Sequence, residues 1–325
     1  MKRSVMQISI PVATCAAALL SAVAAAQSYP TKAVRVIIAQ APGSANDLVA
    51  RIVGNKLAES MGQQFVVDAR PGAGGMLGTE IAARAAPDGY NLFMTNSSAH
   101  GSNPALYAKL PYDAVKDFAP IIFVAASPYV LNVHPSLPVK SVKELISLAK
   151  ARPGQINYAS AGNGSVHQLS GELLKSMAGI DIVHIPYKGS TPAIAALVSG
   201  EVSIMFATVT SIQAQIKSGR VRGLAVTTLK RTELMPGLPT VAETLPGFEM
   251  TSWFGLMAPA GIAPAIVGRL NAETAKVLAL PDVRATLTAQ GFEVTGGTPE
   301  QFADYIRREI AKFTKLARAT GIKAE

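Results

Sequence analysis

The spacing of hydrophobic and polar positions switches back and forth between two patterns along the chain. Short runs of β-branched and other apolar residues predict strands, and longer stretches with apolar residues every three or four positions predict helices. In the first third of the chain, strands are predicted at 34–38, 65–68 and 90–95, and the helices between them at 47–61 and 78–86. This order predicts a mostly parallel sheet with helices on both faces.

A second unit of the same kind follows. Strands are predicted at 130–133, 156–159, 183–185, 202–206 and 224–227, with helices at 142–151, 166–177 and 191–199. Three more helices are predicted at 265–279, 282–289 and 299–319, and Pro281 opens the middle one. The pattern therefore predicts two α/β lobes.

We expect the chain to cross between the lobes near 125–129 and again near 247–254, with the C-terminal helices returning to the first lobe. The predicted division is a signal segment at 1–26, one lobe formed by 27–127 plus 251–325, and the other lobe at 128–250. Two lobes joined by two crossing segments would leave a ligand cleft between them.

The first 26 residues have the pattern of a secretory signal. Lys2 and Arg3 form a charged start, an apolar, Ala-rich run covers 10–26, and small residues precede Gln27. An uncleaved membrane anchor is the alternative, but the run is short and contains Pro11. We expect cleavage before Gln27 and a secreted mature protein.

The only cysteine, Cys15, lies inside this segment. Thr14 precedes it and the apolar run continues well past it, so we do not expect lipidation. The mature chain then has no thiol, which excludes disulfides, cysteine nucleophiles and thiolate metal sites.

Composition and charge narrow the function further. Of the 325 residues, 49% are hydrophobic and 16% are charged, and the formal net charge is +9. Loss of the signal segment would lower the charge to about +7. The basic residues are scattered, with no stripe and no interleaved aromatic residues, so we do not expect a nucleic-acid partner.

Three loops share one design, in which small residues join a predicted strand to a predicted helix. They cover 42–47, 70–78 and 159–167. Glycine and serine let backbone N–H groups approach a ligand, and a helix N-terminus adds partial positive charge, so such loops favour anions. Asp47 is expected to hold the first loop rather than to touch an anion.

The second loop contains Gly72-x-Gly74, as a dinucleotide fingerprint would. Leu77 stands at the third glycine position and no acidic residue follows at the required distance, so we interpret this loop as a tight turn. The third loop mirrors the first, and the two could hold a ligand from opposite sides. No P-loop sequence occurs in the chain.

Catalytic signatures are missing from the sequence. The four histidines form no H-x-x-x-H or H-E-x-x-H pattern, so no zinc or other metal site is predicted. No G-x-S-x-G nucleophile elbow occurs either. His134 and His184 are expected to pack or lie at the surface, whereas His100 and His167 stand beside Gly/Ser loops and are better placed for a site.

Several motifs, taken together in order, resemble a known family. They are Pro42-Gly43-Ser44-x-x-Asp47, Arg70-Pro71-Gly72-Ala73-Gly74-Gly75, Ala86-Pro87-Asp88-Gly89-Tyr90, Asn103-Pro104-Ala105-Leu106-Tyr107, Leu110-Pro111-Tyr112-Asp113, Lys116-Asp117-Phe118, Asn157-Tyr158-Ala159-Ser160, Ile185-Pro186-Tyr187-Lys188-Gly189, Leu238-Pro239-Thr240-Val241, Trp253-Phe254-Gly255 and Ala258-Pro259-Ala260-Gly261. Their order and spacing resemble the Bug family, the extracytoplasmic solute receptors of tripartite tricarboxylate transporters, over essentially the whole mature chain.

The resemblance implies an α/β, two-lobed periplasmic binding protein of type II-like architecture, each lobe a mostly parallel sheet flanked by helices. It implies a noncatalytic protein, without cofactor or metal, that closes on a small carboxylate. Backbone N–H groups, hydroxyls and ordered waters would hold the carboxylate. The implied partners are this ligand and the membrane components of the transporter, and we expect a monomer.

The candidate ligand-binding residues come from both lobes. They are Pro42, Gly43, Ser44, Ser98, His100, Ala161, Gly164, Ser165, His167, Tyr187, Lys188, Ala207 and Thr208. The pair Tyr187 and Lys188 could close the site or simply belong to a turn before Gly189. A purely conformational role remains the alternative for the glycines.

Two positions depart from the family pattern. Ser44 stands where the family usually has a second glycine, which adds a hydroxyl donor but restricts the backbone. Ala207 stands where many members have an aspartate, which suggests a less polar or non-amino ligand.

Two other functions stay open at this point. A secreted enzyme acting on a small anion would need a titratable group with a strongly shifted pKa in the cleft. A sensor without a transport role would need a surface for a signalling protein, about which the sequence says nothing.

Overall fold

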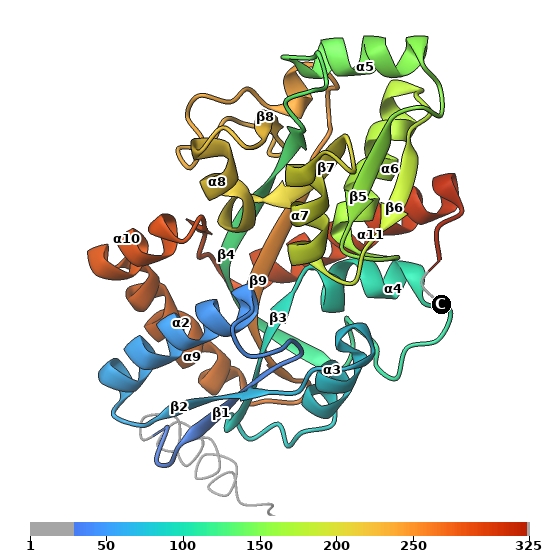
Figure 1. Ribbon diagram of the computed structural model, residues 1–325. Helices are drawn as coiled ribbons and strands as arrows, with labels where there is room; N and C mark the ends of the chain where they lie inside the picture. The colour runs from blue at the N-terminus through green and yellow to red at the C-terminus, as the bar shows by residue number, and fades with distance from the viewer. Residues whose placement is uncertain (1–28, 324–325) are drawn as a thin grey trace, which may run out of the picture.

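The computed structural model describes residues 29–323, and the predicted signal segment with Cys15 lies outside the described residues. The chain forms two α/β lobes, one above the other in Figure 1. The first holds β1, β2 and β3 with α2 and α3, and the second holds β5, β6 and β7 with α5 to α8. The two-lobed α/β architecture predicted from the sequence is confirmed.

The sheet of the first lobe combines parallel and antiparallel pairs. β1 (Val34–Ile38) lies between β2 (Phe65–Ala69) and β3 (Asn91–Asn96) and is parallel to both. β9 (Thr251–Pro259) joins β3 in antiparallel register, and β4 (Phe118–Val133) joins β9 in the same way. The short β10 (Glu293–Val294) pairs with β4.

The sheet of the second lobe has the same plan. β5 (Asn157–Ser160) is parallel to β6 (Val183–Pro186) and to β7 (Ile204–Thr208). β7 and β8 (Arg222–Val226) both pair in antiparallel register with the end of β4. Most strands predicted from the sequence form the parallel part of each sheet, but those predicted at 130–133 and 224–227 fall in β4 and β8, which pair antiparallel. β9 and the first part of β4 add further antiparallel pairing that the sequence did not predict.

β4 belongs to both lobes. Its pairing with β9 extends as far as Pro128, opposite Thr251, and its pairing with β7 begins at the next residue, Tyr129. Only 130–133 was predicted as strand, because the segment is buried on both faces and lacks alternation. Pro120 and Pro128 also lie in β4, although proline is unfavourable in the interior of a sheet. The structure accommodates Pro120 beside a register shift.

The crossing segments predicted near 125–129 and 247–254 fall on β4 and at the start of β9. The first crossing is therefore strand throughout, and the second becomes strand from Thr251 onward. The domain limits at 127/128 and 250/251 stay a prediction.

The helices cover the sheets and form the C-terminal part of the chain. Their bounds are α2 (Ala45–Met61), α3 (Met76–Ala83), α4 (Asn103–Leu106), α5 (Val142–Ala151), α6 (Val166–Ala178), α7 (Ser190–Ser199), α8 (Val209–Lys217), α9 (Pro264–Ala279), α10 (Pro281–Ala289) and α11 (Pro299–Thr320). Single turns lie at η1 (Ala73–Gly75), η2 (Ser98–Ser102), which is π-helical, and η3 (Val241–Glu243). α4, α8 and the three turns were not predicted, and each is ten residues or shorter.

The C-terminal helix α11 packs along β4, η2 and α4 and also contacts α6 of the second lobe. A capping box opens it, in which Thr298 and Gln301 satisfy each other's backbone N–H groups. Its Glu309 is buried, accepts the indole N–H of Trp253 at 3.0 Å and pairs with Lys312. The C-terminal helices were predicted to return to the first lobe. The last of them, α11, also contacts the second lobe.

The contact between α6 and β5 gives a test of packing in the second lobe. A Cβ added at Gly171 of α6 would lie 2.3 Å from the ring of the buried Tyr158. Alanine is more favourable than glycine within a helix by about 1 kcal/mol. At Gly171 the added methyl group overpacks the contact with Tyr158, which costs about 1–3 kcal/mol. We therefore expect Gly171→Ala to lower the free energy of unfolding in urea.

Gly268 in α9 is the matched control, because a Cβ there would meet nothing within 4 Å. Gly268→Ala should keep or raise the free energy of unfolding by up to about 1 kcal/mol. Equal effects of the two substitutions would contradict the packing argument.

Candidate functional site

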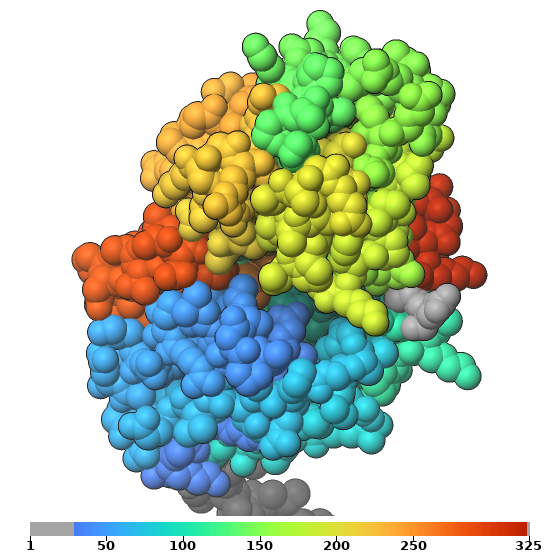
Figure 2. Space-filling view, viewed as in Figure 1, coloured from blue at the N-terminus to red at the C-terminus, as the bar shows by residue number. Residues whose placement is uncertain are grey.

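A cavity of about 180 Å³, called the main cavity below, lies between the two lobes, where Figure 2 shows a hollow between the blue and the yellow segments. Its wall is formed by Gln40, Ala45, Asn96, Ser97, Ser98, Tyr129, Ala161, Ser165, Val166, His167, Ser252 and Phe254. A second cavity of about 170 Å³, the side cavity, is lined by Gly74, Ser98, Asn103, Tyr107, Asn163, Gly164 and Ser165. Ser98 and Ser165 line both cavities.

The first wall of the main cavity is the N-terminus of α2. Ser44 caps this helix and accepts the N–H of Asp47 at 3.3 Å. Asp47 in turn accepts the N–H of Gly43 at 3.0 Å and pairs with Arg51 at 2.9 Å. Burial alone would raise the pKa of Asp47, but the hydrogen bonds from Arg51 and Gly43 hold it below its usual range. Asp47 therefore holds the loop, as predicted.

The N-terminus of α6 forms the facing wall with the same arrangement. Ser165 caps the helix and accepts the N–H of Gln168 at 3.4 Å. The side-chain oxygen of Gln168 accepts the N–H of Gly164 at 2.7 Å. The two loops therefore match position for position, with glycine, serine cap and a locking side chain three residues after the cap.

This arrangement decides which backbone N–H groups of the two loops remain without a partner. The N–H groups of Gly43 and Gly164 are already bonded to Asp47 and Gln168. The first two N–H groups of a helix have no partner within it. In α2 they belong to 45–46 and in α6 to 166–167, and Ala45, Val166 and His167 line the main cavity. The glycines predicted to bind an anion shape the loops, and the residues after the serine caps carry the free donors.

Two buried side-chain nitrogens on the wall have no partner. Asn96 accepts the N–H groups of Ser98 and Ala99 with its oxygen, at 2.9 and 3.1 Å, and its Nδ2 is left unbonded. His167 contacts Ser190 through Nε2 at 3.2 Å, and its Nδ1 is left unbonded. Burial lowers the pKa of His167 to about 4, so this imidazole is neutral at neutral pH.

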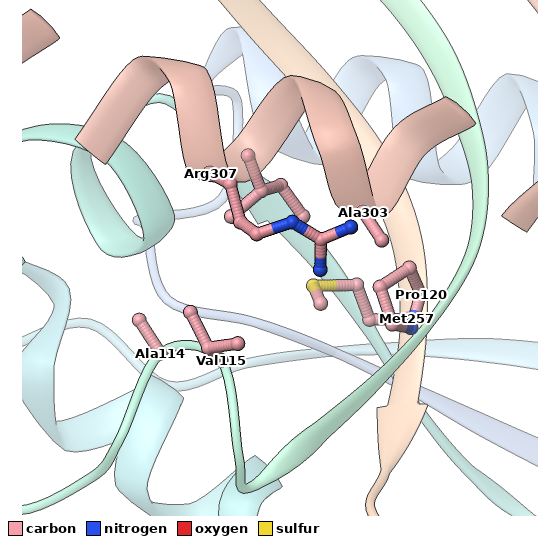
Figure 3. A pocket seen from close by; sticks show the side chains of 7 residues that line it. Ala114, Val115, Pro120, Met257, Ala303 and Arg307 are labelled. Atoms are coloured by element: carbon pink, nitrogen blue, oxygen red, sulfur yellow. The ribbon is translucent and has the colours of Figure 1, made fainter. Parts of the chain in front are cut away.

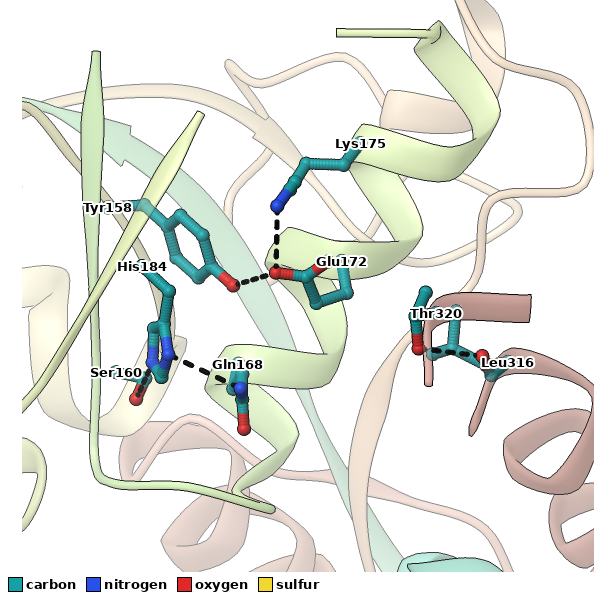
Figure 4. A network of polar contacts seen from close by, with 8 residues as sticks. All are labelled: Tyr158, Ser160, Gln168, Glu172, Lys175, His184, Leu316 and Thr320. Carbon is teal, nitrogen blue, oxygen red and sulfur yellow. Dashed lines mark hydrogen bonds and ion pairs between the residues drawn. The ribbon is translucent and has the colours of Figure 1, made fainter. Parts of the chain in front are cut away.

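A polar network under the second-lobe loop fixes its position (Figure 4). His184 contacts Ser160 at 2.6 Å through Nε2 and Gln168 at 3.3 Å through Nδ1. Its ring stacks on Tyr158, whose hydroxyl donates to Glu172 at 2.6 Å. Because Gln168 also holds Gly164, this packing role of His184 supports the cavity wall.

His100 lies behind the wall of the main cavity rather than on it. It is fully buried, its Nδ1 lies 2.6 Å from the hydroxyl of Thr95, and its ring meets that of Phe118 at 4.5 Å. Burial lowers its pKa to about 3, so it stays neutral. The π-helical turn η2 turns the His100 side chain into the core while Ser98 faces the cleft.

Other candidates lie outside both cavities. Residues 42–44 precede the wall residue Ala45 and lie at the surface or partly buried. Tyr187 donates to Glu201 at 2.8 Å, and burial, together with this hydrogen bond, raises the pKa of Tyr187 to about 12. Lys188 is exposed. This pair belongs to the turn before α7, and no wall residue of either cavity comes from it.

The predicted back wall at 207–208 is likewise not part of either cavity. Ala207 is fully buried in the core of the second lobe, because β7 is an inner strand of the sheet. Thr208 caps α8, and its hydroxyl contacts that of Ser211 at 3.0 Å. Of the predicted residues, the structure brings together Ser98, Ala161, Gly164, Ser165 and His167.

The wall residues missed by the sequence analysis lie partly on strands and partly in loops, in turns or at helix ends. Tyr129 lies where β4 crosses between the lobes, and Ser252 and Phe254 lie on β9 opposite it. Neither crossing was recognised as a strand, so no face could be assigned to it. The polar run 96–98 at the end of β3 was a usable signal, but only Ser98 was taken from it.

No charged side chain lines either cavity. Within residues 29–323, His, Cys, Asp and Glu form no group of three or more that could hold a metal ion. In the same part of the chain, no helix combines the length and hydropathy needed to cross a membrane. The site therefore offers neutral hydrogen-bond donors and acceptors.

A further hollow, beside α11, is mostly apolar and much smaller (Figure 3). Its volume is about 70 Å³, and Ala114, Val115, Pro120, Met257, Ala303, Ile306 and Arg307 line it. Small-molecule sites usually measure ~300–1,000 Å³, so this hollow is a packing defect rather than a ligand site.

These features match a known family of receptors. The sequence profile of the TctC family, described as the tripartite tricarboxylate transporter family receptor, matches residues 49–322. The chain belongs to this family. Protein BugT of Bordetella pertussis is 36% identical over 99% of both chains.

Two solved structures with bound carboxylates are similar to this chain. Rpa4515 of R. palustris with adipate has a TM-score of 0.81 at 36% identity and covers 91% of this chain and 99% of its own. MatC (Rpa3494) from Rhodopseudomonas palustris with bound malate has a TM-score of 0.76 at 33% identity and covers 89% of this chain and 99% of its own. The protein is thus a solute-binding receptor of the periplasmic binding protein class.

The buried neutral histidines predict a pH dependence of stability. His100 and His167 have folded pKa values of about 3 and about 4, below the ordinary 6.5. Between each folded pKa and the ordinary value of 6.5, the unfolded chain takes up protons that the folded chain does not. The free energy of unfolding therefore falls as pH falls through this range. The expected slope is about 1.4 kcal/mol per pH unit for each histidine below pH 6.5.

Urea unfolding at pH 7.5, 6 and 5 measures this slope. The control is His100→Asn, which can keep the contact with Thr95 and removes one titrating group. Its slope between pH 6 and 5 should be shallower by about 1 kcal/mol per unit. Parallel pH profiles for both proteins would show that His100 does not titrate as described.

Proposed function

We propose that the protein captures a small carboxylate in the main cavity by closure of the two lobes. The ligand would then pass to the membrane components of a tripartite tricarboxylate transporter. The observation that carries the proposal is the pair of facing helix N-termini, each with a serine cap and free N–H groups on the cavity wall. A carboxylate between them would accept hydrogen bonds from both lobes, so binding would favour the closed state.

The side chains of the main cavity also suit an anion. Asn96 Nδ2 is a buried donor without a partner, and an unsatisfied buried donor costs about 1–3 kcal/mol, which a ligand oxygen would relieve. His167 can present a proton on Nδ1, because the neutral ring has two tautomers. No acidic side chain on the wall would repel a carboxylate.

An enzyme on this fold would need an activated nucleophile or a base near neutral pKa in the cavity. The titratable groups on the main-cavity wall are His167, with its pKa lowered to about 4, and Tyr129, whose pKa burial raises. Neither is suited to proton transfer at neutral pH. We therefore propose that the ligand leaves the protein chemically unchanged.

The test of the carboxylate site is a thermal-shift and calorimetric screen of the mature protein against small carboxylates. A ligand that binds only the folded protein raises the melting temperature as its concentration rises. Asn96→Asp keeps an oxygen for the N–H groups of Ser98 and Ala99, removes the free donor and adds a negative charge. It should raise the Kd of every bound carboxylate at least ~10-fold.

His134→Ala, at a partly buried position that lines neither cavity, is the control and should leave Kd unchanged. Unchanged affinity in Asn96→Asp, or the absence of any bound carboxylate, would argue against this site. NMR of the recovered ligand tests for turnover, and a converted ligand would favour the enzyme.

We also propose that the protein is exported to the periplasm with cleavage before Gln27. Expression of the full chain in a Gram-negative host should give a periplasmic protein whose intact mass corresponds to 27–325. A matched variant, Ala24→Arg with Ala26→Arg, replaces the small residues that a signal peptidase requires and should accumulate uncleaved. A wild-type protein that keeps residues 1–26 would show that this segment is an anchor.

A further inference from the structure

The loop 70–75 contributes to the wall of the side cavity and not to that of the main cavity. Gly74 of η1 lines the side cavity together with Tyr107 from the end of α4. Asn103 fixes the loop by donating its side-chain N–H to the Gly74 carbonyl at 3.2 Å. A Cβ at Gly74 would lie 2.9 Å from the Tyr107 hydroxyl, so the glycine lets this tyrosine lie directly against the loop.

The side cavity adjoins the main cavity and is lined by residues of both lobes. Ser98 from the first lobe and Ser165 from the second line both cavities and therefore stand at their junction. On the side-cavity wall, Asn103 and Tyr107 face Asn163 and Gly164 of the second lobe. A ligand that extends past the two serines would thus contact both lobes a second time.

The volumes favour one ligand that fills both spaces. The main cavity measures about 180 Å³ and the side cavity about 170 Å³, and each is below the ~300–1,000 Å³ of ordinary small-molecule sites. Joined at the two serines, they reach the lower end of that range. A ligand confined to the main cavity would leave half of the enclosed space unused.

The chemistry of the two cavities differs. The main cavity has a surplus of donors, because two helix N-termini open onto it. In the side cavity the Gly164 N–H is already bonded to Gln168, and the remaining groups are two side-chain amides and three hydroxyls. Amides and hydroxyls offer donors and acceptors together and no charge, which suits a neutral polar group better than a second anion.

We propose that the side cavity is a specificity subsite for the far end of an extended carboxylate, and that this end carries an uncharged hydrogen-bonding group such as a hydroxyl. Tyr107 and Asn163 are the residues that select it. The inference rests on the proposed function, since the carboxylate end occupies the main cavity.

The experiment compares hexanoate, 6-hydroxyhexanoate, adipate and propanoate by isothermal titration calorimetry and ligand-observed NMR. The first two acids differ only in the terminal hydroxyl. Wild-type protein should bind the hydroxy acid about 3–10-fold more tightly than hexanoate, the effect of one or two hydrogen bonds. Tyr107→Phe, which keeps the ring, should reduce this ratio toward about 1.

Asn163→Trp places a large ring at an exposed loop position and should fill the side cavity. It should weaken the six-carbon acids at least ~10-fold more than propanoate, because only the longer chains reach past the junction. Asn163→Ala is its matched control and should weaken the hydroxy acid without a comparable loss for hexanoate. Circular dichroism and urea unfolding confirm that each variant is folded.

The outcomes separate the two proposals. If wild-type protein binds these acids but Asn163→Trp weakens all of them equally, or none, the subsite is overturned and the carboxylate receptor stands. Tighter binding of adipate than of 6-hydroxyhexanoate would overturn the neutral far end. If no carboxylate binds to folded wild-type protein, the proposed function fails and the subsite fails with it.

Discussion

The pairing of β4 with strands of both lobes is the constraint on which the cleft depends. β4 leaves its pairing with β9 at Pro128 and begins its pairing with β7 and β8 within the next two residues. The floor of the main cavity is therefore continuous sheet, with Tyr129 on β4 and Ser252 and Phe254 on β9. Because the strand is shared, each lobe keeps its own core while the loops at the ends of β1, β3 and β5 face one another.

Within this frame the proposed carboxylate would be held without a positive side chain. A buried carboxylate must replace its hydration by several donors, and helix N-termini can supply them at fixed positions. Asp47 and Gln168 each use a side-chain oxygen to hold the glycine that precedes the cap. The loops are thereby fixed before a ligand arrives, which lowers the entropy lost on binding. Burial keeps His167 neutral, so the site has the same charge across the neutral pH range.

The short turn η2 connects the cavity to the core. Ser98 faces both cavities, whereas His100, two residues later, packs among aromatic rings of the first lobe. A Cβ at Gly101 would lie 3.0 Å from Phe313 of α11, so the turn and the C-terminal helix approach closely. α11 also contacts α6, and so the last helix of the chain touches elements behind both walls of the cleft.

The sequence by itself determined the local elements and the design of the two loops. Periodicity located most helices to within a few residues, as for α5 at Val142–Ala151, because one face of each is apolar and caps mark the ends. The pattern of a glycine and a serine before a helix was visible at 43–44 and at 164–165. What these loops bind was inferred from their helix N-termini, a local property.

Only the tertiary structure decided which residues share the cleft. β4 and β9 could not be recognised, because a strand buried on both faces has no alternation and its register depends on partners far away in the chain. Tyr129, Ser252 and Phe254 were therefore missed. His100 and Ala207 stand beside plausible loops in the sequence, yet packing turns both into the core. The direction of a side chain relative to a cleft depends on long-range contacts, which no local pattern records.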